Sequence, residues 1–255
     1  TVDVINSDIV SDCTGNAPQY VVYYSDYGDG QIRTGIEVNF VNTDVSITGE
    51  EMNFVGGEGA PSIKEQDVEV AGGNFNFDVN EDYFAPGYAQ NEDGYVLPSD
   101  MQDAVAKIEK GDGAVSYYND LQAAVDAAVD GDVVVVIKDI TTSSALIKNT
   151  AKAPLAAEIV IDLNGKTITA TGSGYYLFEL IPTTSLTITS STGKATVVAN
   201  QAMQIRADDA PTVDILVEKI DFSGTITDKS AIYLNKYGAA PSSTSVRRPS
   251  RANSG

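Results

Sequence analysis

Histidine and tryptophan are absent from these 255 residues, and cysteine occurs once, as Cys13. The lack of histidine excludes the Ser-His and Cys-His nucleophile arrangements and most zinc sites, because these need an imidazole as base or ligand. A single cysteine cannot form a disulfide within the chain, so Cys13 is interpreted as a small buried hydrophobic residue. Any catalytic group must therefore be a carboxylate, a lysine, an arginine or a tyrosine.

Positive charge is also scarce. The chain has 16 Lys and Arg residues against 36 Asp and Glu residues, a formal net charge of −20. Such a surface repels polyanions, which excludes nucleic acid and anionic membranes as partners. The sequence contains neither an apolar run of the length that a membrane span needs nor the pattern of a signal peptide. Because the chain begins at Thr1 rather than Met, we expect a fragment whose export signal lay upstream.

What the sequence does have is a threefold repeat of short strand patterns between Glu158 and Tyr233. Aligning Ile161 with Leu186 and Ile215 gives repeat lengths of 186 − 161 = 25 and 215 − 186 = 29 residues. The three patterns recur in the same order, at 159–163, 185–189 and 213–217, then at 166–169, 194–198 and 219–222, and last at 176–180, 202–206 and 231–234. A repeat with three strands leaves no room for a crossover helix. The predicted fold class is therefore mainly β, a right-handed parallel β-helix (β-solenoid).

Residues 1–97 carry a second and longer repeat. Strand patterns at 2–5, 36–40 and 68–70 are spaced by 36 − 2 = 34 and 68 − 36 = 32 residues, and glycine-rich loops absorb the extra length. Residues 78–97 then gather aromatic and acidic side chains in an irregular segment. A solenoid end needs a plug, because its last coil otherwise exposes apolar core and strand edges. We interpret 1–97 as the C-terminal coils and end plug of a first β-helix.

Residues 98–118 are predicted to be a junction, with two interpretations. Ser99 and Gln102 would form a capping box that opens a helix through Ile108, whereas 104–108 and 114–118 flank a Gly-Asp-Gly turn like the strands of a hairpin. The hairpin is favoured, and the helix stays open as the alternative.

A helix is expected after the junction, with Asn119 as its N-cap and Gly131 at its end. Its apolar residues fall at helical spacing on one face: Leu121, Ala124, Val125, Ala128 and Val129. The apolar run 133–137 that follows is typical of a strand buried on both faces. Residues 119–238 are therefore predicted to be a capping helix and the first coils of a second β-helix, and 239–255, rich in Ser, Ala, Pro and Arg, a disordered or foreign tail.

Two parts of the sequence resemble pectin-lyase-like β-helix modules of large bacterial cell-surface, adhesin-like proteins. Residues 117–132 with 159–168 resemble the start of such a module, and 72–75 to 93–96 is similar to the segment that ends one. The resemblance covers about two thirds of the chain, and its motifs are structural. It implies an extracellular location on a bacterial surface, with adjacent β-helix modules of the same parent chain as neighbours. It implies no particular activity.

Three carboxylates are the candidates for catalysis. Asp208 and Asp209 are the best candidates for the acid pair of a glycoside hydrolase or polysaccharide lyase, because two acids must flank the scissile bond, and Arg206 is the nearest cation. Asp162 is expected to point outward from its strand, before the Asn164-Gly165 turn. For each acid, a solvated turn or strand surface is the simpler interpretation. We therefore assign no catalytic residue and predict that the chain is not an enzyme, with the lyase or hydrolase as an alternative.

Calcium is the one cofactor that composition suggests. Residues 78–82 copy the D-x-N-x-D opening of an EF-hand loop, but Tyr83 stands where glycine is needed and Ala89 where a bidentate glutamate belongs. An EF-hand is thus excluded, and neither a cofactor nor a metal ligand is assigned. A looser calcium site among these acids stays open.

The predicted function is a non-catalytic structural or adhesive segment of an exported bacterial surface protein, with surface or host glycans or proteins as partners. A glycan-binding β-helix module is the first alternative. In that case Tyr175 and Tyr176 would stack on sugar rings at the flat lateral face of the second solenoid. The missing tryptophan argues against it.

Overall fold

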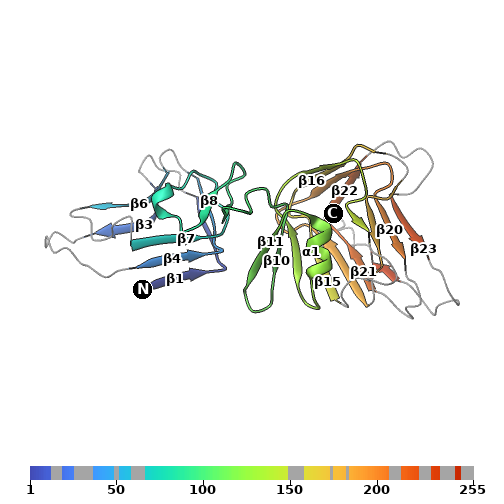
Figure 1. Ribbon diagram of the computed structural model, residues 1–255, viewed down its shortest axis with the longest axis horizontal. Coiled ribbons are helices and arrows are strands. Elements are labelled where there is room, and N and C mark those ends of the chain that lie inside the picture. Colours follow the sequence, from blue (N-terminus) through green and yellow to red (C-terminus); the bar gives the residue numbers. More distant parts are fainter. Residues whose placement is uncertain are drawn as a thin grey trace, which may run out of the picture. The chain divides into compact units, whose positions relative to one another are not determined.

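The computed structural model describes residues 1–12, 19–25, 37–48, 52–58, 67–148, 158–172, 175–181, 184–206, 214–223, 231–235 and 245–247. The chain divides into two compact units, Thr1–Gln102 and Asp103–Gly255, and each has a hydrophobic core formed by its own residues. Both units consist of short parallel strands stacked coil upon coil (Figure 1). The predicted fold class, a mainly β parallel solenoid, is confirmed.

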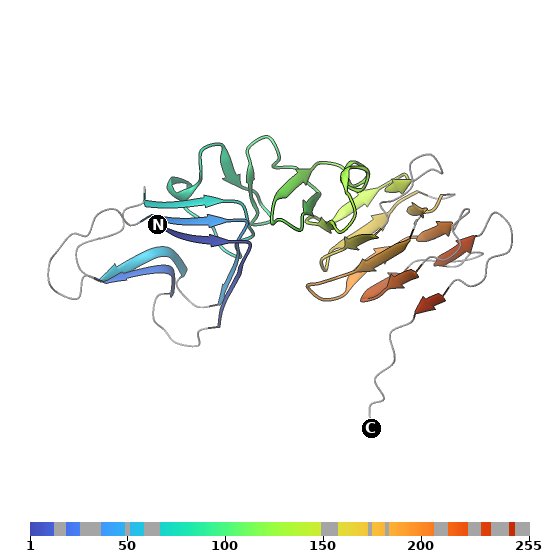
Figure 2. The same cartoon turned by 90° about the horizontal axis from the view of Figure 1, so that it is seen from below.

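In its described ranges, the first unit has two coils of three strands and the start of a third coil. Each strand pairs in parallel with its counterpart in the next coil, in the order β1-β4-β7, β2-β5 and β3-β6 (Figure 2). The strands are β1 (Val2–Ile5), β2 (Asp8–Asp12), β3 (Gln19–Ser25), β4 (Val38–Val41), β5 (Asp44–Thr48), β6 (Met52–Glu58) and β7 (Val68–Ala71).

The register of these coils differs from the sequence alignment. Val2 pairs with Val38 and Val38 with Val68, so the coil lengths are 38 − 2 = 36 and 68 − 38 = 30 residues. The expected lengths of 34 and 32 depended on Ile36, which lies outside the described residues. Because side chains alternate along a strand with a period of two, a shift of two residues keeps the same side chains facing the core. Strand positions are therefore confirmed and the register is corrected.

The bend between the first two sheets of this unit repeats with one backbone conformation. Asn6, Asn42 and Gly72 have positive φ angles of 47°, 47° and 98°. The amide of Asn6 donates to the carbonyl of Val41 (2.9 Å), and the amide of Asn42 donates to that of Ala71 (3.1 Å). Asparagine and glycine adopt this left-handed region more readily than other residues, so the same corner is built in successive coils.

Aromatic rings fill the core of the first unit. The ring of Phe54 lies between those of Phe40, Phe75, Phe77 and Tyr83, with centroid separations of 5.2, 5.8, 6.3 and 5.3 Å. Separations and tilts of this kind are the favourable ones for aromatic pairs.

Residues 78–97 lie over the end of this core. The segment contains the short 3-10 helix η2 (Glu81–Tyr83), β8 (Tyr88–Gln90) and β9 (Val96–Pro98), of which β8 and β9 pair antiparallel. Phe84 forms a parallel bridge to Val70, and the amide of Ala85 donates to the carbonyl of Val70 at 2.9 Å. The segment thus occupies the edge of β7 that β4 leaves open, which is what a plug must do.

The second unit opens with a hairpin rather than a helix. β10 (Ala106–Glu109) pairs antiparallel with β11 (Val115–Tyr118), and Gly113 in the turn has a φ of 85°. β10 also pairs antiparallel with β12 (Val133–Val136), so the hairpin extends the first sheet of this unit. Gln102 closes the junction by donating to the carbonyls of Ala89 and Leu97 at 3.1 and 3.0 Å, and caps no helix.

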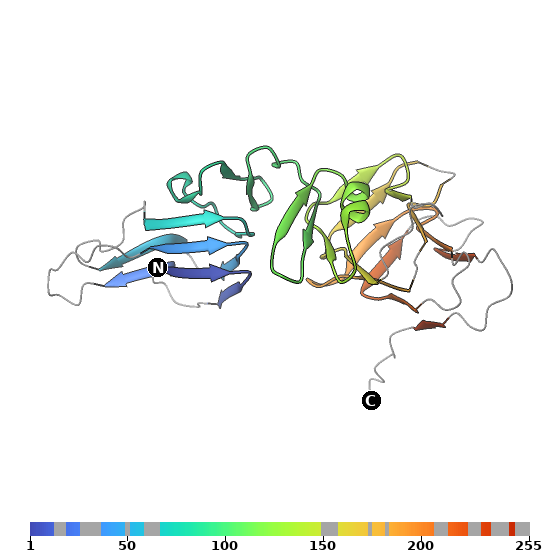
Figure 3. The ribbon, with the colours of Figure 1, turned by 60° about the horizontal axis from the view of Figure 1, so that its bottom comes forward.

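The expected helix forms as α1 (Leu121–Ala127), beside the hairpin (Figure 3). Its N-cap is Asp120 and not Asn119, because the Asp120 carboxylate accepts a hydrogen bond from the amide of Ala123 at 2.8 Å. Leu121, Ala124, Val125 and Ala128 face the core as predicted. Val129 does not: the chain becomes extended at Ala128, and the Val129 side chain is 61% exposed.

After α1 the chain stacks its coils in three parallel sheets. The first sheet has the order β11-β10-β12-β15-β18-β21-β24, the second β13-β16-β19-β22 and the third β14-β17-β20-β23. The bounds are β13 (Ile140–Thr142), β14 (Ile147–Lys148), β15 (Glu158–Asp162), β16 (Thr167–Ala170), β17 (Phe178–Leu180), β18 (Ser185–Thr189), β19 (Ala195–Val198), β20 (Met203–Arg206), β21 (Asp214–Val217), β22 (Ile220–Ser223), β23 (Ile232–Asn235) and β24 (Ser245–Arg247).

Each of the nine repeated patterns contains one of these strands, and the doubly buried run after α1 is confirmed. Val134, Val135 and Val136 are 0, 5 and 0% exposed. The register is again shifted: Ile159 pairs with Leu186 and Leu186 with Ile215, so the coil lengths are 186 − 159 = 27 and 215 − 186 = 29 residues. Residues 245–247 form β24 against β21, so this part of the expected tail adds to the first sheet. The rest of 239–255 lies outside the described residues.

Candidate functional site

Asp162 lies at the end of β15, where the chain turns from the first sheet into the second. The residue is 7% exposed, and its Oδ1 accepts hydrogen bonds from the backbone amides of Asn164 (2.7 Å) and Ser191 (2.9 Å). The expectation that Asp162 points outward is therefore wrong. Strand alternation ends at this corner, so Ile161, Asp162 and Leu163 are all buried. The carboxylate joins its own turn to the turn of the next coil.

A ladder of polar side chains continues from this corner into both neighbouring coils. Asn164, with a φ of 48°, donates from Nδ2 to the carbonyl of Val136 (3.1 Å) and accepts at Oδ1 from the hydroxyl of Thr192 (2.9 Å). The fully buried Ser190 accepts at Oγ from the amide of Gly165 (2.7 Å). Leaving such a buried group unpaired costs about 1–3 kcal/mol. The polar side chains at this corner therefore hold the coils together.

The other two catalytic candidates, Asp208 and Asp209, lie outside the described residues. The strand that precedes them, β20, ends at Arg206 and belongs to the third sheet, whereas Asp162 belongs to the first. Of the three acids, the structure places one, and the carboxylate of that one is committed to two backbone amides.

Tyr175, the first of the two glycan-binding candidates, closes its own loop. Its hydroxyl accepts a hydrogen bond from the amide of Gly172 at 3.2 Å. A Cβ atom on Gly172 would come within 2.7 Å of Tyr175 Cε1, so the ring packs directly on that glycine. A ring held in this way braces the loop and is not presented as a flat platform.

Tyr176, the second candidate, stacks on Tyr233, which the sequence analysis did not single out. The two ring centroids are 6.0 Å apart with an interplanar angle of 16°, and Tyr233 is 42% exposed. Burial, the neighbouring Tyr233 and the Glu179 carboxylate raise the pKa of Tyr176 above its ordinary value. The phenol of Tyr176 is therefore a neutral hydroxyl group, able to donate, throughout the physiological pH range.

Tyr233 belongs to a row of outward side chains on the third sheet. Lys148, Glu179, Gln204 and Tyr233 occupy equivalent positions on β14, β17, β20 and β23. The residues just before the first three, Ile147, Phe178 and Met203, are buried in the core at 0, 1 and 0% exposure, so the row faces the other way. Lys148 Nζ lies 3.9 Å from Glu179 Oε2, with side chains 64 and 20% exposed. We call these four residues together with Tyr176 the tyrosine platform.

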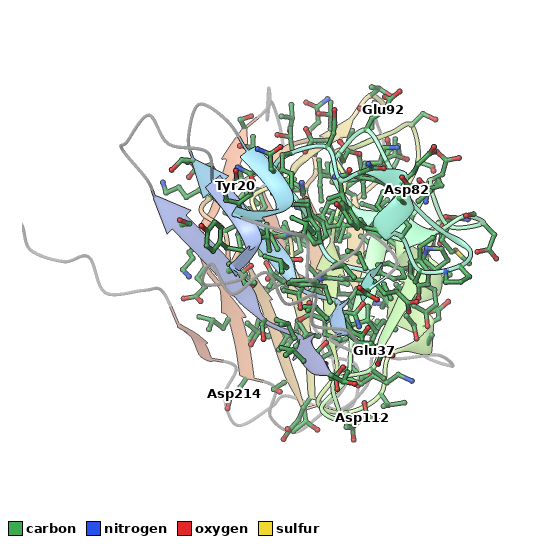
Figure 4. All side chains as sticks on the ribbon, turned by 90° about the vertical axis from the view of Figure 1, so that its left-hand side faces the viewer. Tyr20, Glu37, Asp82, Glu92, Asp112 and Asp214 are labelled. Atoms are coloured by element: carbon green, nitrogen blue, oxygen red, sulfur yellow. The ribbon has the colours of Figure 1, made fainter. Side chains whose placement is uncertain are left out.

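The acidic segment 78–93 of the first unit borders a cavity of about 260 Å³. Its amide side chains are engaged within the fold: Asn76 pairs with the backbone of Ile47 and Gln90 with the backbone of Val79. Asp82 and Glu92 project from the periphery (Figure 4). Among the residues that the structure describes, no three acidic or cysteine side chains lie close enough together to hold a metal ion.

Within the described ranges, the helices are too short and too polar to cross a membrane. Comparisons of the chain with family models, with curated proteins and with solved structures give no match. The parallel solenoid, its polar corner ladder and the tyrosine platform are therefore the findings on which a function must be built.

Proposed function

We propose that this chain is a non-catalytic structural segment of an exported bacterial surface protein, built from pectin-lyase-like β-helix modules. The observation that carries this proposal is the corner ladder. The most buried acidic candidate, Asp162, spends its carboxylate on backbone amides of two successive coils. Such groups make a long, self-supporting scaffold, because each coil of a solenoid is stabilised by its neighbours.

A surface location fits the composition. The strongly acidic charge of −20 favours solubility, and a chain with one cysteine is insensitive to an oxidising exterior. The sequence on either side in the genome tests this part of the proposal. We expect an export signal, further β-helix modules and a cell-wall anchor. Flanking domains of a cytosolic enzyme would contradict it.

Contact with glycans is the second candidate function, and the tyrosine platform is the observation that favours it. Exposed aromatic rings beside carboxylate and amide groups suit a sugar, which has both apolar ring faces and hydroxyl groups. This role is compatible with a scaffold and requires no catalytic pair.

The absence of turnover is the first testable prediction. The purified chain should release no new reducing ends and no unsaturated uronate from pectin, polygalacturonate, alginate or xylan, with calcium supplied. The reason is that a lyase or hydrolase needs convergent acids or an acid and a cation, and Asp162 is bound within the corner. Turnover that disappears in Asp208→Asn or Asp209→Asn, but survives in a matched Asp126→Asn variant on the exposed side of α1, would favour the enzyme alternative.

A further inference from the structure

The tyrosine platform runs along the direction in which the coils stack. Its members Lys148, Glu179, Gln204 and Tyr233 come from successive coils, one from each strand of the third sheet. Neighbouring strands lie about 4.8 Å apart. An elongated ligand on this face therefore meets a new side chain at each coil, at an interval close to the length of one pyranose in an extended chain.

The tyrosine pair leaves aromatic surface available. Rings in contact are separated by about 3.5 Å between planes, whereas the centroids of Tyr176 and Tyr233 are 6.0 Å apart with planes only 16° from parallel. The rings are thus displaced sideways and overlap only in part. Tyr233, at 42% exposure, keeps much of its surface open to a ligand.

The polar members select the kind of ligand. Glu179 accepts hydrogen bonds, Gln204 both donates and accepts, and Lys148 lies 3.9 Å from Glu179, so that the local charges offset each other. Around them the protein carries a net charge of −20, which disfavours acidic polysaccharides such as polygalacturonate. A neutral chain with many hydroxyl groups meets no such repulsion.

We infer that the tyrosine platform binds an extended neutral polysaccharide that lies along the stacking direction of the coils, with sugar rings against Tyr176 and Tyr233 and hydroxyl groups on Glu179 and Gln204. This inference rests on the glycan contact named above as the second candidate function. It gives that contact a face, a direction and a ligand class.

The test uses the full chain and soluble β-1,4-linked glucose oligomers as probes, measured by titration calorimetry. Tyrosine emission gives a second readout, because the chain has 13 Tyr and no Trp. We expect the hexamer to bind more tightly than the dimer, since it spans more coils. Tyr233→Ala should weaken binding of the hexamer about tenfold, the equivalent of one stacking contact.

Two variants serve as controls. Tyr233→Phe keeps the ring and should bind within about threefold of the unaltered chain. Tyr23→Ala removes a tyrosine that is 53% exposed in the other unit and should bind as the unaltered chain does. Melting curves establish that each variant is folded. Equal binding of dimer and hexamer, undiminished binding by folded Tyr233→Ala, or tighter binding of polygalacturonate would overturn the inference. So would the absence of any binding, while the lack of turnover would still stand.

Discussion

Replacing Val134 with Asp is expected to unfold the second unit. Val134 is 0% exposed and lies between Ile108 of β10 and Ile161 of β15, each 1% exposed. A carboxylate there has no partner and faces the apolar core, at a cost of about 4 kcal/mol or more. Calorimetry of the full chain should show the loss of the transition of the second unit, whereas the first unit, with its own core, keeps its transition.

The matched control is the same substitution at Val129, which is 61% exposed. Val129→Asp should change the free energy of unfolding by less than about 0.5 kcal/mol, as surface substitutions do. If Val134→Asp melts like the unaltered chain, β12 is not the buried strand that joins the hairpin to the coils.

Replacing Gly73 with Ala is expected to have the second-largest effect, this time on the first unit. Gly73 has a φ of 108°, and a Cβ there would lie 2.0 Å from the carbonyl oxygen of the buried Thr43. Backbone strain and overlap together cost about 3 kcal/mol or more, because the obstacle is backbone and cannot rotate away. The melting temperature of the first unit should fall by about 10 °C or more.

Gly87 separates the two contributions. Its φ is 83°, yet nothing lies within 4 Å of its virtual Cβ. Gly87→Ala should therefore show the conformational strain alone, about 1–2 kcal/mol. Equal effects of the two substitutions would mean that the close approach of the second and third coils at Thr43 is absent.

The strands were predictable because alternation of apolar residues is a local property. Each repeated pattern of the second unit holds one strand of the solenoid. The register was not predictable, because a shift of two residues leaves the same side chains in the core. What fixes it is the corner, where Asp162 and Asn164 bond across coils, and such contacts between residues far apart leave no periodic signal in the sequence.

The same reason explains the candidate sites. Asp162 reads as an outward strand residue only if alternation continues through the corner, and it does not. Tyr176 was found as an exposed tyrosine, but its partner Tyr233 is 57 positions away, from 233 − 176. Aligning the coils in the observed register places Tyr233 in the row of Glu179 and Gln204. A row of this kind becomes visible once the coil length is known.

Disulfide cross-linking tests the stacked-coil register most directly. In a Cys13→Ser background, cysteines at 160 and 187 occupy paired positions on β15 and β18, with Cα atoms about 4.8 Å apart, well suited to a disulfide. Cysteines at 160 and 185, the pair that the sequence alignment favours, would be about 8 Å apart, beyond that range. We expect near-complete oxidation of the 160/187 pair and little of the 160/185 pair. The reverse preference, or no cross-link in either, would contradict the solenoid described above.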